Sequence, residues 1–460
     1  MTSGNSTNSQ SKSYTSALIT MTSLFFMWGF MTVMNDVLIP HLKKIFELSY
    51  FQSMLVQTSF FSAYFFGSLV YYLISSSSGD PINKIGYKNG NIIGLVLSAL
   101  GSALFYPATI LHVYWFYLLA LFVLGLGFTI LQITANPYVA ILGDPKTASS
   151  RLNLAQGFNS LGTTLGPLVG GTLIFKYFAG DEAVKIPYLV LAGFLLFLAI
   201  IIKFSKLPEF ANEENIEKGS GALKFPQLKL GILAIFAYVG GEVAVGSILI
   251  SFFGLENIAG LNEHDASSFL SLYWGGLMIG RFSGAIYLSD IPNQTKKFGF
   301  MILAALAAFF VIYFSNSIKS GMELSTVAPL LIFIVLAFIL FVLGKSIPSR
   351  TLYLFATIVI ILLLTTILTE GKIAFWAVIA IGLFNSIMWS NIFTLAIDGL
   401  GKYTSQGSSL LVMAILGGAI IPPLQGWMAD HIGVQLSFIV PIFCYIYIFY
   451  YGISGCKKRI

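Results

Sequence analysis

The chain has 460 residues, of which 57% are hydrophobic and only 10% are charged. Soluble globular proteins carry roughly 25% charged residues, so this composition excludes a set of soluble domains and indicates a polytopic membrane protein. Two cysteines are too few for a disulfide framework, and the formal net charge of +6 says little about partners, because Lys and Arg in membrane proteins mainly set orientation.

Apolar runs long enough to cross a bilayer, about 20 residues each, follow a polar tail in which we expect no cleaved signal. The first six runs lie at 17–39, 51–74, 89–110, 113–141, 153–176 and 187–205. A polar stretch rich in Glu, Lys, Gly and Pro then follows, as is typical of a linker. Eight further runs lie at 229–254, 266–289, 298–316, 326–344, 351–369, 373–397, 406–428 and 434–454. We therefore predict an all-α polytopic membrane protein with about fourteen helices.

The basic residues of the predicted turns indicate how the chain is oriented. If the N-terminus is cytoplasmic and the runs alternate in direction, 18 Lys and Arg residues lie in cytoplasmic segments, six lie in external segments, and Arg281 lies within a span. Positive residues concentrate on the cytoplasmic side of membrane proteins. The sequence thus predicts that both termini are cytoplasmic.

An internal repeat divides the chain into two related halves. Asn136 precedes Pro167 by 31 residues, and Asn391 precedes Pro422 by the same 31 residues. Each unit reads as a helix with an Asn in its inner part, a charged turn, and a Gly-rich helix that ends in Gly and Pro. Repeated halves around a central site are typical of secondary transporters.

The spacing of the repeat also indicates an insertion. The two units are 255 residues apart, whereas the single carboxylates in the first helix of each half, Asp36 and Glu242, are 206 residues apart. The difference of 49 residues corresponds to two helices and their turns. We therefore predict a 6+6 helix core of the major facilitator type with one extra transmembrane hairpin. The expected domains are an N-terminal six-helix bundle at 1–205, a cytoplasmic linker at 206–228, and a C-terminal bundle at 229–460 with the hairpin at about 298–344.

Three ionisable residues lie well inside the predicted spans: Asp36, Glu242 and Arg281. Such side chains cost ~3 kcal/mol or more at the centre of a bilayer and mark functional sites by default. We expect Asp36 and Glu242 to bind the coupling cation, and Arg281 to act as a gate or clamp near the inner surface. Structural alternatives stay open, with Asp36 paired to His41 or Lys43 at the interface and Glu242 in a buried pair with Arg281.

Asn and Gln side chains form a second group within the apolar runs. Each amide can both donate and accept hydrogen bonds, and although a single one often only joins two helices, the number here suits a neutral, polyhydroxylated ligand. Tryptophan can stack on the apolar face of a sugar ring, or simply pack against other helices. The predicted substrate-binding residues are Asn35, Gln57, Gln132, Asn136, Gln156, Asn159, Asn391 and Trp389.

The turn GDPINKIGYKNG after the second run carries Asp80, Lys84 and Lys88 between glycines. We expect these charges to lock the cytoplasmic side through ion pairs that break on opening. The sequence contains no Walker A motif, no HExxH, no Cys/His metal cluster and no Ser/His/Asp set. We therefore predict no enzyme activity, no bound metal and no cofactor other than a coupling ion.

Several segments resemble the fucose/galactose/glucose:cation symporter family of the major facilitator superfamily, the group that contains L-fucose permease. The likeness covers most of the chain and rests on SLFFMWGFMTVMNDVLIP, ITANPYVAILG, RLNLAQGFNSLG, YVGGEVAVGS and FNSIMWSNIFTLAI. It implies twelve core helices, a central sugar site, and proton-coupled uptake across the bacterial inner membrane. It also implies that Asp36 acts in sugar binding and proton coupling.

Two positions depart from L-fucose permease and are similar to the glucose/galactose-type members. The permease has a proton-carrying glutamate where this chain has Gln132, and a glutamine where this chain has Glu242. The resemblance therefore implies a glucose- or galactose-like substrate. It leaves open whether Glu242 takes over the proton or whether Na⁺ serves as the coupling ion.

We predict a symporter that imports a neutral hexose with H⁺ or Na⁺ by alternating access, as a monomer in the lipid bilayer and without nucleic acid. The alternatives are a fucose or N-acetylhexosamine symporter, an uncoupled sugar facilitator, and a sugar sensor without net flux. A polytopic membrane glycosyltransferase is a remote alternative, because such enzymes need acidic residues on sizeable loops and the longest loop here is the linker at 206–228.

Overall fold

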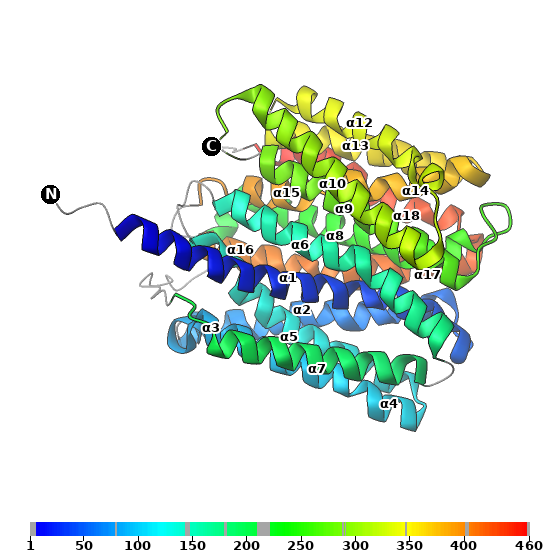
Figure 1. The fold of residues 1–460 in the computed structure, drawn as a ribbon, viewed down its shortest axis with the longest axis horizontal. Helices are drawn as coiled ribbons and strands as arrows, with labels where there is room; N and C mark the ends of the chain where they lie inside the picture. The colour runs from blue at the N-terminus through cyan, green and yellow to red at the C-terminus, as the bar shows by residue number, and fades with distance from the viewer. Residues whose placement is uncertain are drawn as a thin grey trace.

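The computed structural model describes residues 6–78, 81–142, 148–178, 182–208, 221–287, 289, 291–345, 347–400 and 404–457, and every regular element among them is a helix. The long helices run side by side along the long axis of the molecule (Figure 1). The described chain begins and ends at one end of this bundle, which we call the terminal end. The other end, where the first helix finishes, is called the opposite end.

The N-terminal half contains six long helical segments. The third is broken near Leu104 into two helices, and the fifth ends in a wider π-helical turn. The elements are α1 (Ser6–Ile45), α2 (Tyr50–Ser78), α3 (Pro81–Ala103), α4 (Phe105–Leu111), α5 (Tyr114–Ile141), α6 (Ala148–Thr172), η2 (Leu173–Tyr177) and α7 (Glu182–Phe204).

The C-terminal half contains eight segments, several of them interrupted. Its elements are η3 (Gly221–Lys224), α8 (Pro226–Phe253), α9 (Glu263–Tyr287), α10 (Gln294–Ser320), α11 (Leu324–Val327), α12 (Pro329–Gly344), α13 (Pro348–Leu368), α14 (Gly371–Asn385), α15 (Met388–Ile397), α16 (Thr404–Met413), η5 (Ala414–Leu416), α17 (Gly417–Ile432), η6 (Leu436–Phe438), α18 (Ile439–Tyr450) and η7 (Tyr451–Gly455).

Within the described residues, twelve helical segments are long and apolar enough to cross a membrane. The long helices α6 and α9 are not among the twelve, because Ser, Thr, Asn and Gly make up much of their sequence. These two helices pack against each other in the middle of the molecule, where polar side chains are shielded from lipid. Together they complete the fourteen helices that the sequence predicts.

The two halves meet along two seams. One seam joins α6 to α9, and the other joins α2 to α17. Within each half a peripheral helix packs in the same way: α3 lies against α5 and α7, and α13 lies against α14 and α18. By contrast, α10 packs on α9, while α12 packs on α13 and α14. The helices α10 and α12 thus lie outside the packing pattern that the two halves share.

Glycine allows the closest helix contacts. A Cβ atom added at Gly162 of α6 would lie only 2.1 Å from the carbonyl oxygen of Phe26 on α1. Likewise, a Cβ at Gly29 of α1 would lie 2.0 Å from the carbonyl oxygen of Asn159. Only glycine permits this approach, so the Gly-rich pattern of α6 holds its backbone directly against α1.

Candidate functional site

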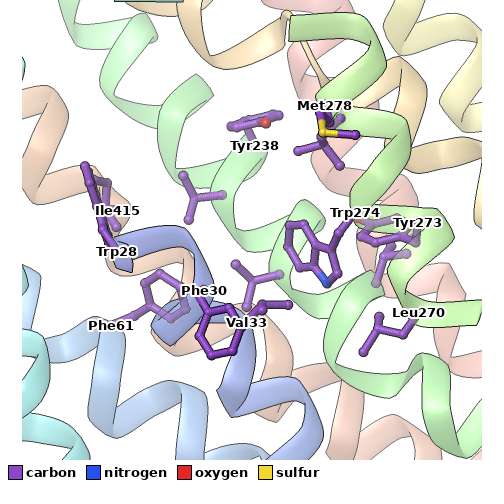
Figure 2. Close-up of a cluster of buried hydrophobic side chains, with 14 of the residues drawn as sticks. Trp28, Phe30, Val33, Phe61, Tyr238, Leu270, Tyr273, Trp274, Met278 and Ile415 are labelled. Carbon is purple, nitrogen blue, oxygen red and sulfur yellow. The ribbon is translucent and has the colours of Figure 1, made fainter. Parts of the chain in front are cut away.

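A central cavity lies between the two halves. It is lined from α1, α2, α5 and α6 on one side, and from α8, α9, α15 and η5 on the other. Figure 2 shows Trp28 and Phe61 of the N-terminal half facing Tyr238 and Trp274 of the C-terminal half. The lining thus combines aromatic rings from both halves with polar side chains, and any ligand held here contacts both.

Asp36 is the polar centre of the wall nearer the opposite end. It is 2% exposed and accepts hydrogen bonds at Oδ1 from Gln57 Nε2 (2.8 Å) and Ser247 Oγ (3.0 Å), and at Oδ2 from Trp274 Nε1 (3.1 Å). Gln57 belongs to the same half, whereas Ser247 and Trp274 belong to the other half. The carboxylate therefore joins α1 and α2 to α8 and α9, and the alternative pairing with His41 or Lys43 is replaced by this network.

Glu242 lies on the facing wall and is 8% exposed. Its Oε1 accepts a hydrogen bond from the hydroxyl of Tyr238 (2.5 Å), which also lies 3.2 Å from the carbonyl oxygen of Asn385. The side chain of Asn385 in turn contacts the hydroxyls of Tyr273 (3.2 Å) and Tyr445 (2.8 Å). A chain of close polar contacts thus leads from Glu242 through Tyr238 to Asn385, the last residue of α14 before the break that precedes α15.

Arg281 also lines the cavity, where it joins the two halves. Its Nη1 donates to Ser160 Oγ on α6 (2.8 Å), and its positive charge acts electrostatically on Glu242. The hydrogen-bond donor to the Glu242 carboxylate is Tyr238. Arg281 therefore holds α9 against α6 through its hydrogen bond to Ser160. It acts on Glu242 through its charge, whereas Tyr238 supplies the hydrogen bond to that carboxylate.

Five of the eight predicted substrate-binding residues line this cavity: Gln57, Gln132, Gln156, Asn159 and Trp389. Their amides come from α2, α5 and α6 of the N-terminal half, and Trp389 comes from α15 across the cavity. Trp389 stacks on Phe393 with ring planes 16° apart, which presents its indole as a fixed face.

The other three predicted residues support the lining from behind. Asn35 Nδ2 lies 3.4 Å from Gln57 Oε1, and Asn136 Nδ2 donates to Gln132 Oε1 (2.7 Å). Asn391 Nδ2 lies 3.3 Å from the carbonyl oxygen of Pro348, and thus connects α15 to the start of α13. These amides orient cavity residues or helices and do not reach the cavity themselves.

The predicted cytoplasmic lock is only partly within the described residues. Asp80 lies outside them, and for Lys84 the structure describes the backbone alone. Lys88 Nζ donates to the carbonyl oxygen of Ser205 at 2.9 Å, a contact inside the N-terminal half. Gly86 has a non-helical, positive-φ conformation that breaks α3 beside this turn. Lys88 therefore ties α3 to the end of α7, and this contact does not join the two halves.

Tyr238, Ser247 and Trp274 are not among the site residues predicted from the sequence. Tyr238 had a usable signal, because it lies four residues before Glu242 and residues at that spacing share one face of a helix. No sequence pattern indicates Ser247 or Trp274, since these residues are 211 and 238 residues from Asp36 along the chain. Only the packing of the two halves brings them together.

The family model described as Major Facilitator Superfamily matches residues 17–344, which is more than half of the chain. The chain belongs to the Major Facilitator Superfamily. As a member of this superfamily it is a transporter, so the expectation that it is not an enzyme is confirmed.

Relatives within the Major Facilitator Superfamily align along nearly the whole chain. A Brucella abortus protein named glucose/galactose transporter is 43% identical over 459 residues, covering 98% of this chain and 96% of the relative. The L-fucose-proton symporter of Escherichia coli is 28% identical over 473 residues, covering 96% and 94%. A crystal structure of the transporter FucP in the outward conformation has a TM-score of 0.67 at 27% identity, covering 97% and 100%. The resemblance to the fucose/galactose/glucose:cation symporters is confirmed.

Proposed function

We propose that this protein is a secondary active symporter that carries a neutral hexose, of the glucose or galactose kind, together with a proton or Na⁺. The observation that carries the proposal is the pair of buried carboxylates, Asp36 and Glu242, one on each wall of a cavity lined by amides and aromatic rings. A buried carboxylate favours binding of a proton or cation, because its surroundings disfavour an uncompensated negative charge.

The cavity chemistry supports a sugar as the substrate. Gln132, Gln156 and Asn159 offer amide donors and acceptors, which match hydroxyl groups that also donate and accept. Trp28 and Trp389 offer flat apolar faces from opposite halves for the ring of the sugar. The relatives named glucose/galactose transporter and L-fucose-proton symporter support the same substrate class.

Asp36 can couple cation binding to a movement of the two halves relative to each other. All three side chains that contact it act as donors, and two of them come from the other half. A proton or cation on Asp36 removes the negative charge that attracts Ser247 and Trp274, and thereby weakens the contact between halves. The names of the fucose relatives favour a proton as the coupling ion, with Na⁺ as the alternative.

The cellular setting is part of the proposal. We place the transporter in the bacterial inner membrane as a monomer, with both termini in the cytoplasm. The excess of Lys and Arg on that side of the bundle supports this orientation. The halves are proposed at 1–205 and 229–460 around the linker at 206–228, with α10 and α12 as the inserted hairpin.

Uptake by the purified protein in proteoliposomes tests the proposal. Radiolabelled glucose, galactose, fucose, mannose and N-acetylglucosamine are offered under an imposed ΔpH, under a Na⁺ gradient, and without a gradient. We expect accumulation of glucose or galactose above equilibrium with one of the two ions. Equilibration without accumulation would identify an uncoupled facilitator, and no uptake of any sugar would contradict the proposed function.

A further inference from the structure

The extra helices α10 and α12 form an apolar groove on the outside of the C-terminal half. The groove has a volume of about 470 Å³ and is lined by apolar side chains alone, including Ile302 and Leu306 of α10 and Val335 and Ile339 of α12. Ile302, Val335 and Ile339 are 49%, 61% and 50% exposed. Because α10 packs on α9 while α12 packs on α13 and α14, the two helices leave this channel between them.

The groove reaches the membrane surface at the terminal end. Leu343, which lines it, is one residue from the end of α12, and Ile302 is eight residues from the start of α10. With a helical rise of 1.5 Å per residue, the deepest lining residues, Leu306 of α10 and Ile334 of α12, lie roughly 15–18 Å from that surface. This depth is about half the ~30 Å hydrocarbon thickness of a bilayer, and therefore suits an acyl chain that enters from one leaflet.

Exposed lysines stand at the terminal ends of both helices that form the groove. Lys296 lies in the first turn of α10, and Lys345 directly follows the last residue of α12. Both side chains are exposed. Lys345 also has a left-handed backbone with φ 51°, at a helix end where glycine is the usual residue. In contrast, the neighbouring Lys297 is buried, and its Nζ donates to the carbonyl oxygen of Tyr287.

We propose that this groove is a binding site for an anionic phospholipid. One acyl chain occupies the channel between α10 and α12, and the phosphate headgroup lies between Lys296 and Lys345. Basic residues at the surface end of a groove between transmembrane helices match the negative headgroup, while the apolar channel excludes a soluble anion. The proposal is independent of the transported substrate and of the coupling ion.

Native mass spectrometry of the purified full-length protein in detergent tests this site, with phosphatidylglycerol and phosphatidylcholine as probes. We expect one tightly bound phosphatidylglycerol, and weaker binding of phosphatidylcholine. The double variant Lys296→Gln/Lys345→Gln should weaken phosphatidylglycerol binding roughly tenfold or more, given about 1 kcal/mol per lysine near the surface. The matched control is Lys372→Gln, an exposed lysine at the opposite end of the neighbouring α14.

A second variant separates the groove from the lysines. Ile339→Trp fills the channel from an exposed position and should reduce the binding of both lipids, whereas the lysine variant changes only the anionic one. Equal binding of the two lipids to all forms would show a non-specific lipid layer and overturn the proposal. A lipid-free dimer abolished by Ile339→Trp would instead identify the groove as an interface between copies, and would also overturn it.

Discussion

Asp36 accepts hydrogen bonds from both halves, and its own charge maintains them. In Asp36→Asn the side chain stays the same size but is permanently neutral, and its amide group offers a donor where three donors already point. We expect loss of gradient-driven sugar accumulation by at least tenfold in proteoliposomes. Glu323→Gln, which neutralises an exposed carboxylate beside α11, is the control. Unchanged concentrative uptake would remove Asp36 from the coupling mechanism.

Glu242 and Tyr238 form the second residue-scale test. Tyr238→Phe removes only the hydroxyl that joins Glu242 to Asn385, and Glu242→Gln removes the charge. We expect both variants to retain sugar exchange without a gradient, but to lose most of their accumulation with one. The control is Tyr287→Phe, whose hydroxyl contacts Phe341 away from the cavity. If accumulation and exchange fall in parallel, Glu242 acts in sugar binding and not in coupling.

At this scale the sequence predicted the carboxylates but not their partners. Asp36 and Glu242 stand out because so few charged residues lie in the apolar runs. Asn391 shows the limit of the same reasoning: its place in the repeat is matched by Asn136, yet one amide supports a cavity residue and the other connects two helices. Composition and spacing identify polar residues inside the membrane, whereas the direction of each side chain depends on the packing.

At the scale of elements, α17 of the C-terminal half packs against α2 of the N-terminal half, and the two helices are joined at the opposite end of the bundle. The carboxylate of Asp430, near the end of α17, accepts hydrogen bonds from the backbone N–H groups of Tyr50 (2.8 Å) and Phe51 (2.9 Å) in the first turn of α2. These N–H groups have no partner within their own helix, and the helix dipole adds to the attraction. The contact joins the two halves where the cavity must open to that side.

Removal of this contact should favour opening at the opposite end. Hydrogen bonds to a charged group contribute ~1.5–3 kcal/mol, so Asp430→Ala is expected to shift the conformational equilibrium by about tenfold or more. In a variant whose only cysteine is Ser53→Cys, a position buried in α2, thiol labelling should become faster by a similar factor. Asp265→Ala, which loses contacts only inside one half, is the control. Equal labelling rates in both would contradict this role of Asp430.

The contact between α1 and α6 makes a prediction about stability. Gly162→Ala places a methyl group 2.1 Å from the carbonyl oxygen of Phe26, whereas Gly193→Ala on α7 meets no atom within 4 Å. We expect the first substitution to lower the melting temperature of the purified protein clearly. The second should leave it unchanged or raise it slightly, since Ala favours a helix by up to about 1 kcal/mol over Gly. Equal melting temperatures would show that the close contact between α1 and α6 does not contribute to the stability of the protein.

Most helix boundaries were predictable within about five residues, although α1 and α3 begin 11 and 8 residues before the predicted runs at 17–39 and 89–110. The interruptions were not predictable. The run at 373–397 appears continuous in the sequence, yet the structure divides it after Asn385. No proline marks this break, and the related helix α5 of the N-terminal half is continuous. Hydropathy depends only on the apolar character of the residues, so it cannot detect a break at which tyrosine hydroxyls from neighbouring helices contact Asn385.

For the whole molecule, the pattern of apolar runs predicted the number of helices and the 6+6 core with an added pair. It could not indicate which helices lie in the centre. The long helices α6 and α9, which are too polar to count among the twelve apolar segments, pack on each other along one seam between the halves, because polar side chains there contact each other and the cavity instead of lipid. The contacts between halves were equally hidden, since Arg281 and Ser160 meet only after the bundles pack.

The inserted helices also change how the carrier sits in its membrane. Buried Asn316 of α10 contacts Ser271 of α9, so α10 is attached to the C-terminal half and must move with it. That half therefore meets the lipid over a wider perimeter than the other half. A mismatch between protein and bilayer thickness costs free energy at each lipid contact. A change in bilayer thickness should therefore cost more free energy at the C-terminal half than at the N-terminal half. We therefore expect the transport rate to depend on the acyl-chain length of the surrounding lipids.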